Sequence, residues 1–179
     1  MRTARGDFRA ERIVHASGHD IDRLFPETAE KYDVRRCVLQ MFEVASPGGG
    51  VVEPAILTGT SMLRYGGFLA MPSAAAVRAE IEAAAPESLD AGLNLMFTQR
   101  PDGALVLGDT HRYELTHSPF DDEHLSALVL REGARLLGAE LRVLRRWRGV
   151  YASSAVTDFL VAEPFPGARV VSVTSGIGM

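Results

Sequence analysis

The chain has 179 residues, of which 46% are hydrophobic and 23% are charged. This composition is that of a globular domain of ordinary size, and it excludes a disordered tail. Acidic residues outnumber basic ones by 23 to 19, and the resulting net charge of -4 argues against a nucleic-acid-binding surface. No stretch of about 18 apolar residues occurs, so the sequence predicts no membrane span.

Cysteine usage and the first residues indicate a reducing compartment. Cys37 is the single cysteine, so the chain can form neither an internal disulfide nor a thiolate metal site of its own. It lies within an apolar stretch, where a buried, inert thiol is expected rather than a nucleophile. Residues 1–12 alternate charges with small residues and lack the apolar core of a signal peptide. We therefore expect a cytoplasmic protein.

The first part of the chain is expected to be rich in short strands. Two extended pieces flank a tight turn at Gly6-Asp7, and small residues follow a strand that ends at Ile13-Val14. β-Branched and aromatic residues over 34–45 predict a long strand that stops before Pro47. The other elements predicted up to residue 70 are a short helix over 21–25, capped by Asp20 and closed by Pro26, and strands over 55–57, 62–65 and 68–70.

The rest of the chain mixes helices with strands. Alanine and glutamate predict a helix over 73–85, ended by Pro86. The strongest turn signal is Pro101-Asp102-Gly103, which joins strands over 93–100 and 104–109 into a hairpin. The other predicted elements are a helix that starts at Ser118 to Asp121 and ends at Gly138, and strands over 141–151, 159–162 and 169–174. This mixture predicts the α+β class, with a mainly antiparallel sheet and two or three helices.

An apolar strand delivers a glycine-bearing turn near each end of the chain. The first turn is Ala16, Ser17 and Gly18, and the second is Ser175, Gly176, Ile177, Gly178 and Met179. Glycine lets a backbone approach a ligand closely, and free N–H groups at such a turn attract negative charge. Each turn taken alone is more often a plain turn than a binding loop.

Few side chains carry a chemical signature of their own. The five histidines have no metal-ligand spacing, so no metal site is expected, and neither a nucleophile elbow nor a phosphate-binding loop occurs. His111 lies just beyond a strand end with Tyr113 beside it, where polar groups commonly line pockets. The arginines at 142, 145, 146 and 148 favour a solvated strand face, with an anion-binding edge as the alternative.

The order and spacing of these pieces resemble the flavoprotein oxidoreductases of the D-amino-acid oxidase type, which include glycine oxidase and sarcosine oxidase. The segments that carry the resemblance are Val14-His15-Ala16-Ser17-Gly18, the hairpin from Gln99 to Thr110, Trp147-Arg148-Gly149-Val150-Tyr151, and Thr174 to Met179. The resemblance implies that residues 1–33 are a remnant of a FAD-binding domain and that 34–150 form a substrate-binding domain. Residues 151–179 would then return to the FAD-binding domain.

In that family the two glycine turns border FAD, which implies cofactor contacts at Ala16 to Gly18 and at Ser175 to Met179. The implied substrate contacts are Tyr65, His111, Arg112, Tyr113 and Tyr151. The family's GxGxxG cradle for the pyrophosphate and the helix after Met179 are absent from this sequence. We therefore expect this chain to retain FAD poorly, and to be inactive without a missing nucleotide-binding domain.

Tyr151 departs from the family pattern. It falls where the family's amino-acid oxidases place the arginine that pairs with the substrate carboxylate, and a tyrosine cannot form a charged fork. A simple D-amino acid is therefore a less suitable substrate. The segments from Gly108 to Tyr113 and from Trp147 to Tyr151 look most similar to a bacterial branch associated with aminophosphonate breakdown. That similarity implies an amine next to a phosphonate, with His111, Arg112 and Tyr113 as its contacts.

The resemblance implies oxidation of a C–N bond by hydride transfer to flavin, followed by hydrolysis of the imine, with no side chain needed as a strong base. Two alternatives stay open. One is a non-catalytic module that binds a small anion or amine. The other is a non-functional fragment that self-associates through bare sheet edges and helix faces. Homo-oligomerisation is open in each case.

Overall fold

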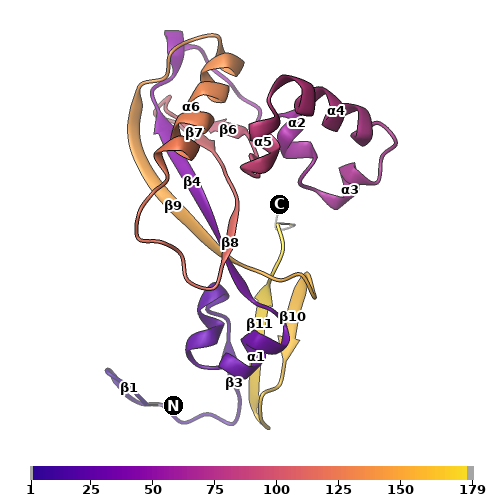
Figure 1. Ribbon diagram of the computed structural model, residues 1–179. Coiled ribbons are helices and arrows are strands. Elements are labelled where there is room, and N and C mark those ends of the chain that lie inside the picture. Colours follow the sequence, from indigo (N-terminus) through magenta and orange to yellow (C-terminus); the bar gives the residue numbers. More distant parts are fainter. Residues whose placement is uncertain (1, 177–179) are drawn as a thin grey trace. The chain divides into compact units, whose positions relative to one another are not determined.

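The computed structural model describes residues 2–176 (Figure 1). The chain divides into two compact units. Unit 1 comprises the residues up to Arg36 together with those from Tyr151 onward, and unit 2 comprises Cys37–Val150. The assignment of these parts to cofactor and substrate binding stays a prediction.

Unit 1 is built on a three-stranded sheet in the order β10-β11-β3. The strands are β3 (Ile13–His15), β10 (Phe159–Ala162) and β11 (Ala168–Val173). β11 pairs antiparallel with β10 and parallel with β3. The buried core of this unit consists of Ile21, Ala29, Val34, Ala152, Leu160 and Val170.

The first residues form a separate two-stranded ribbon of β1 (Arg2–Thr3) and β2 (Gly6–Asp7). The predicted turn at Gly6-Asp7 is therefore wrong by two residues. Thr3 pairs with Gly6, which leaves Ala4 and Arg5 in the turn. The Thr3 hydroxyl closes this turn by donating to the Gly6 carbonyl at 3.0 Å.

The expected helix over 21–25 is also wrong. A 3₁₀ segment, η1 (Gly18–Arg23), takes its place, and α1 (Pro26–Lys31) begins where the helix was expected to end. Proline lacks an N–H group and is well suited to the first helical position, so Pro26 starts a helix here rather than closing one.

Asp20 does not cap a helix but takes part in an ion-pair cluster. The Arg36 guanidinium donates to both carboxylate oxygens of Asp22 at 2.8 Å and to Asp20 at 3.3 Å. This bidentate contact lowers the pKa of Asp22. The Arg36 side chain is only 12% exposed, so the pair joins η1 to the first residues of the long strand that follows.

Unit 2 contains the larger sheet, in the order β5-β6-β7-β4-β8, with β9 also paired to β4. Its strands are β4 (Arg35–Val44), β5 (Ile56–Leu57), β6 (Met96–Gln99), β7 (Leu105–Gly108), β8 (Arg112–Glu114) and β9 (Val143–Ser153). The first two residues of β4 and the last three residues of β9 belong to unit 1. The β5–β6, β6–β7 and β4–β7 pairings are antiparallel. The long strand, the hairpin and the α+β class predicted from the sequence are thus confirmed.

One face of this sheet is covered by α6 (Glu123–Leu137) (Figure 1). Even-numbered residues of β4 point to the helix because side chains alternate along a strand. The core they share is Phe42, Val44, Leu93, Leu95, Phe97, Leu105, Leu107 and Val129. Asp122, not Ser118, caps the helix, accepting from the His124 N–H at 2.9 Å. Gly138 ends it with φ of 65°, as predicted.

The strands predicted over 62–65 and 68–70 are wrong, because these residues lie in two short helices and the turns that follow them. The helices are α2 (Gly59–Met62) and α3 (Gly66–Leu69). Short apolar runs have no clear period and do not separate strand from helix. Further short helical segments are η2 (Pro47–Gly49) and α5 (Pro86–Asp90). Within residues 2–176, only α4 (Ala74–Ala84) and α6 are longer than six residues, and both were predicted.

The packing of α6 on the sheet allows one stability prediction. A Cβ atom on Gly133 would lie 2.7 Å from Cδ2 of Leu107 and 3.1 Å from Cδ1 of Leu141. Leu107 is fully buried, so its side chain has little room to shift. We expect Gly133→Ala to lower the free energy of unfolding by about 1–3 kcal/mol through overpacking, although alanine favours helix by about 1 kcal/mol.

Urea unfolding measures this difference. The matched control is Gly67→Ala in α3, where a Cβ meets nothing within 4 Å. An equal loss in both variants would mean that the contact with Leu107 is not the cause.

Candidate functional site

The two glycine turns of unit 1 lie at one edge of its sheet. β3 and β11 are parallel neighbours, with Ile13 opposite Ala168 and His15 opposite Val170. The carboxyl ends of adjacent parallel strands meet at the same edge, which is the common ligand-binding edge of such sheets. Gly18 adopts φ of 64°, and a Cβ there would meet nothing within 4 Å. Ser17 in the same turn contacts His15 through Oγ and Nε2 at 2.7 Å.

The turn after β11 is held on both sides by backbone contacts. The Thr174 N–H donates to the Asp158 carbonyl, and the Thr174 carbonyl accepts from the Ser154 N–H, both at 2.9 Å. The Thr174 hydroxyl, fully buried, donates to the Thr157 carbonyl. The hydroxyl of Tyr151 lies 3.9 Å from the place that a Cβ on Gly176 would occupy. A side chain at Gly176 would therefore enter the space beside this hydroxyl.

These features fit the edge of a bound cofactor. The turn at Ala16 to Gly18 leaves open space over its glycine, and Gly176 keeps the second turn free of side-chain atoms beside Tyr151. The residues described here are Ser175 and Gly176, while Ile177, Gly178 and Met179, also predicted to contact FAD, lie outside the described residues.

Unit 2 contains a polar cluster of Arg64, Asn94, Asp109, His111 and Tyr113, in which Asn94 and Asp109 are buried and Tyr113 is 49% exposed. Asn94 and Asp109 are joined by two backbone hydrogen bonds, of 2.7 and 2.8 Å. The His111 Nδ1 atom lies 3.1 Å from the Gly92 carbonyl and 3.3 Å from Oδ1 of Asp109. The side chains of His111 and Asp109 are only 6% and 10% exposed. These contacts fix the segment that connects β7 to β8.

Burial controls the protonation of this polar cluster. Burial raises the pKa of Asp109 to about 7, although the hydrogen bond from Asn94 and the charge of Arg64 both act to lower it. Burial, together with the charge of Arg64, lowers the pKa of His111 to about 4. Between these values both side chains are uncharged, so their contact at 3.3 Å is not an ion pair. Opposed shifts of this kind are typical of functional sites.

Tyr113 completes the polar cluster. It accepts a hydrogen bond from Nη2 of Arg64 and also interacts with Cys37, whose side chain is fully buried as predicted. Its ring lies 6.3 Å from that of His111, centroid to centroid. The structure therefore brings together His111 and Tyr113, two of the predicted substrate contacts.

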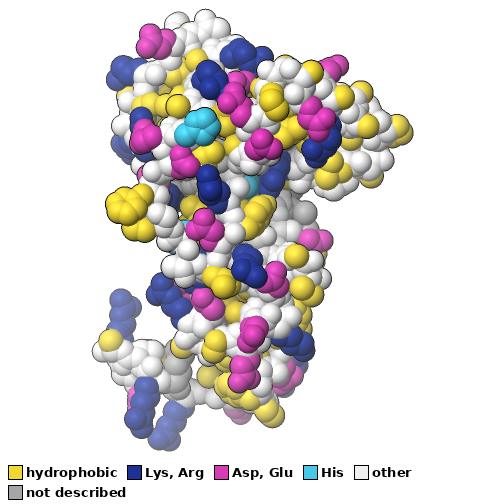
Figure 2. Space-filling view, viewed as in Figure 1, with side chains coloured by type: hydrophobic (Ala, Val, Ile, Leu, Met, Phe, Trp, Pro, Cys, Tyr) yellow, Lys and Arg dark blue, Asp and Glu magenta, His cyan; other side chains and the backbone are white. Residues whose placement is uncertain are grey.

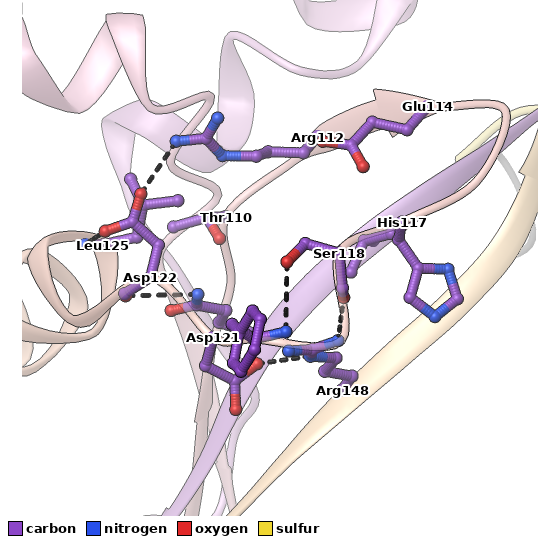
Figure 3. Close-up of a pocket in the computed structure, with 12 residues that line it drawn as sticks. Thr110, Arg112, Glu114, His117, Ser118, Asp121, Asp122, Leu125 and Arg148 are labelled. Atoms are coloured by element: carbon purple, nitrogen blue, oxygen red, sulfur yellow. Dashed lines mark hydrogen bonds and ion pairs between the residues drawn. The ribbon is translucent and has the colours of Figure 1, made fainter.

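Arg112 points the other way. Alternation along β8 places its side chain and that of Glu114 on the opposite face from Tyr113. There they line an open cavity of about 320 Å³ that the loop before α6 and Leu125 also border (Figure 3). Tyr65 precedes α3, and no contact joins it to the polar cluster among the interactions described for residues 2–176. The structure thus separates Arg112 from His111 and Tyr113.

The arginines of β9 are occupied by neighbouring acids and carbonyls. Arg148 donates to Asp121 and to the backbone carbonyls of Ser118 and Pro119 (Figure 3). Arg146 contacts Glu123 at 3.3 Å, and Arg145 lies 3.8 Å from Glu43. Figure 2 shows acidic and basic side chains interspersed over most of the visible surface. These pairs favour the solvated strand face over the anion-binding edge.

Sequence reasoning missed Arg64, Asn94 and Asp109 as members of the polar cluster. Asn94 carried a signal, because it is a polar residue between two apolar ones at the start of a strand. Asp109 carried another, since it follows the last residue of β7. Arg64 carried none, because a short helical segment far from β8 in the sequence delivers it.

Within residues 2–176, no group of three or more His, Cys, Asp or Glu side chains is arranged to hold a metal ion. Over the same residues, no helix has both the length and the apolar character needed to cross a membrane.

Several solved structures share this fold. L-proline dehydrogenase from P. horikoshii superposes with a TM-score of 0.66 at 14% identity, over 99% of this chain and 41% of its own. Glycine oxidase from Geobacillus kaustophilus superposes with a TM-score of 0.65 at 14% identity, over 97% of this chain and 39% of its own. Iminodiacetate oxidase from Chelativorans sp. BNC1 superposes with a TM-score of 0.64 at 13% identity, over 96% of this chain and 39% of its own. The chain therefore spans about two fifths of the length of each neighbour.

At this level of identity the likeness shows a shared fold. No model of a protein family matches the sequence, and no curated protein matches it. Glycine oxidase belongs to the family that the sequence resembles, so the resemblance is confirmed at the level of fold.

Proposed function

Since the chain has the fold of part of glycine oxidase and L-proline dehydrogenase, we propose that it is the substrate-binding part of a FAD-dependent oxidoreductase. The enzyme would oxidise the C–N bond of a small amine or amino acid. The observation that carries this proposal is the pair of glycine turns that follow the parallel neighbours β3 and β11. A likeness in fold alone does not specify a function, whereas two ligand-accessible turns at one sheet edge supply a site.

In this proposal the cofactor is bordered by two turns. Ala16, Ser17 and Gly18 form one border, and Ser175 and Gly176 begin the other. When bound, FAD supplies the acceptor for the hydride that leaves the carbon next to the amine. The backbone of the turns contributes close approach without side-chain atoms, and the Tyr151 hydroxyl lies beside Gly176 at this border.

Unit 2 contributes the substrate contacts. His111 is uncharged near neutral pH, because burial keeps its pKa near 4. Its Nδ1 atom lies 3.1 Å from the Gly92 carbonyl, and this contact fixes the ring that would face the amine. Tyr113 adds a phenol on the same face. These groups bind and orient, and none has to remove a proton as a strong base.

The substrate is a small anionic amine, with an aminophosphonate as the specific candidate. Two features support this choice: Tyr151 cannot offer the bidentate charged fork of an arginine, and the segment from Gly108 to Tyr113 resembles the aminophosphonate-associated branch. Arg112 is not included, because its side chain lies on the opposite face of β8.

The test combines the chain with the nucleotide-binding domain that the resemblance implies, with FAD added. We expect anaerobic addition of 2-aminoethylphosphonate, sarcosine or glycine to bleach the visible flavin absorbance, and the phosphonate to act at the lowest concentration. Gly176→Leu should abolish bleaching, because its side chain occupies the space beside Tyr151. Gly50→Leu is the control, since a Cβ there meets nothing.

A polypeptide that takes up no flavin under any condition would contradict the proposal. If it nevertheless bound the amines, it would be the non-catalytic binding module.

A further inference from the structure

Arg64 differs from the other arginines of unit 2 in its charge environment. Its Nη2 atom donates to the Tyr113 hydroxyl, and Nη1 lies 3.6 Å from the position of a Cβ on Gly92. Its Nε atom is buried, and no hydrogen-bond partner for it exists among the described residues. The guanidinium therefore lies at the polar cluster with most of its N–H donors unused.

Within residues 2–176, no carboxylate lies within ion-pair distance of Arg64. Eight other arginines of unit 2 each form an ion pair with an acid. These pairs are Arg78–Glu82, Arg100–Asp102, Arg112–Asp122, Arg131–Glu87, Arg135–Glu132, Arg145–Glu43, Arg146–Glu123 and Arg148–Asp121. Arg142 also has no such acid, but it is exposed and solvated, whereas Arg64 is half-buried. A half-buried cation without a counter-ion favours the binding of an anion.

The neighbours of Arg64 do not neutralise it. Asp109 is near enough for their charges to interact, but burial keeps its pKa near 7, so much of it is protonated at neutral pH. His111 is uncharged there. Tyr113 accepts from Arg64 and keeps its neutral phenol, because burial raises its pKa. The polar cluster thus presents one positive charge and several neutral hydrogen-bonding groups.

We propose that Arg64 binds the anionic group of the substrate, a carboxylate or a phosphonate, next to Tyr113 and His111. This inference rests on the function proposed above and makes Arg64 a specificity-determining residue. Guanidinium N–H groups match pairs of anionic oxygens in a fork. The short helical segments α2 and α3 then serve to deliver that arginine to the polar cluster.

The experiment measures anion binding by the chain itself, without flavin. Methylphosphonate, inorganic phosphate, acetate and methylammonium are titrated at constant ionic strength, while NMR follows the His111 and Tyr113 side chains. We expect saturable shifts with the anions and none with methylammonium. Arg64→Gln keeps a donor for Tyr113 but removes the charge, and should weaken binding about 10-fold or more. Arg64→Lys keeps the charge without the fork, so its anion affinity should lie between that of the original chain and that of Arg64→Gln.

The matched control is Arg142→Gln, which removes an unpaired arginine from the exposed surface and should bind like the original chain. A stronger response to methylphosphonate than to acetate assigns the phosphonate class, and the reverse assigns the carboxylate class. Binding that Arg64→Gln leaves unchanged, or the lack of any saturable anion shift, overturns the inference. Neither result depends on flavin, so the bleaching test of the proposed function stays independent.

Discussion

The Phe42→Ala variant is expected to lose about 3–5 kcal/mol of unfolding free energy. Phe42 is 1% exposed and lies in the core that β4 shares with α6. Removing its ring takes away buried apolar surface and leaves a cavity that the paired strands on both sides of β4 cannot close. The loss also removes the contact of the ring with the Arg146 guanidinium, which lies 5.7 Å from its centroid.

Urea unfolding followed by fluorescence measures this effect, because Trp147, the single tryptophan, reports on unit 2. The control is Phe120→Ala, where the ring is 81% exposed. We expect the control to change the free energy by no more than about 0.5 kcal/mol. Similar losses in both variants would contradict the placement of Phe42 in the core.

The Asp109→Asn and His111→Gln variants are expected to change the pH dependence of stability in opposite directions. The pKa of Asp109 is raised to about 7 by folding, so its contribution to stability is present below about pH 4 and is lost as pH rises through 7. The pKa of His111 is lowered to about 4, so its contribution is present above about pH 6.5 and is lost as pH falls through 4. Each slope is about 1.4 kcal/mol per pH unit.

Between about pH 4 and 6.5 the two slopes cancel in the original chain. Asp109→Asn exposes the His111 slope, so this variant should lose about 3 kcal/mol relative to the original chain when the pH falls from 6.5 to 4. His111→Gln should instead gain relative stability over the same fall. Urea unfolding at a series of pH values gives both differences. Curves that run parallel to that of the original chain would show that neither side chain is desolvated.

The elements that the sequence predicted are those with local signals. The hairpin at Pro101-Asp102-Gly103 has a turn that proline and glycine specify within three residues, and α6 has its own amphipathic period and its terminal Gly138. The segment 59–70 has no such signal. It forms helices because of what surrounds it, since the Thr58 hydroxyl donates to the Leu95 carbonyl and Gly59 packs against Val77.

The same distinction applies to the candidate site. His111 and Tyr113 could be predicted because they are two residues apart beyond a strand end, and alternation puts them on one face. Arg64 contacts Tyr113 only in the folded chain, because the two residues are 49 positions apart in the sequence. Similarly, the two glycine turns were visible in the sequence, whereas the parallel pairing that puts them on one edge depends on contacts between distant segments.

That pairing also affects how the chain acquires its structure. β3 lies near the amino terminus and β11 near the carboxyl terminus, so their ladder closes a loop that contains nearly every other residue. Unit 2 is continuous in sequence and can collapse while the ribosome is still extending the chain. The sheet of unit 1 must wait for the final strand, and it carries the entropic cost of long-range closure. During synthesis, β3 therefore stays without its partner until β11 has been made.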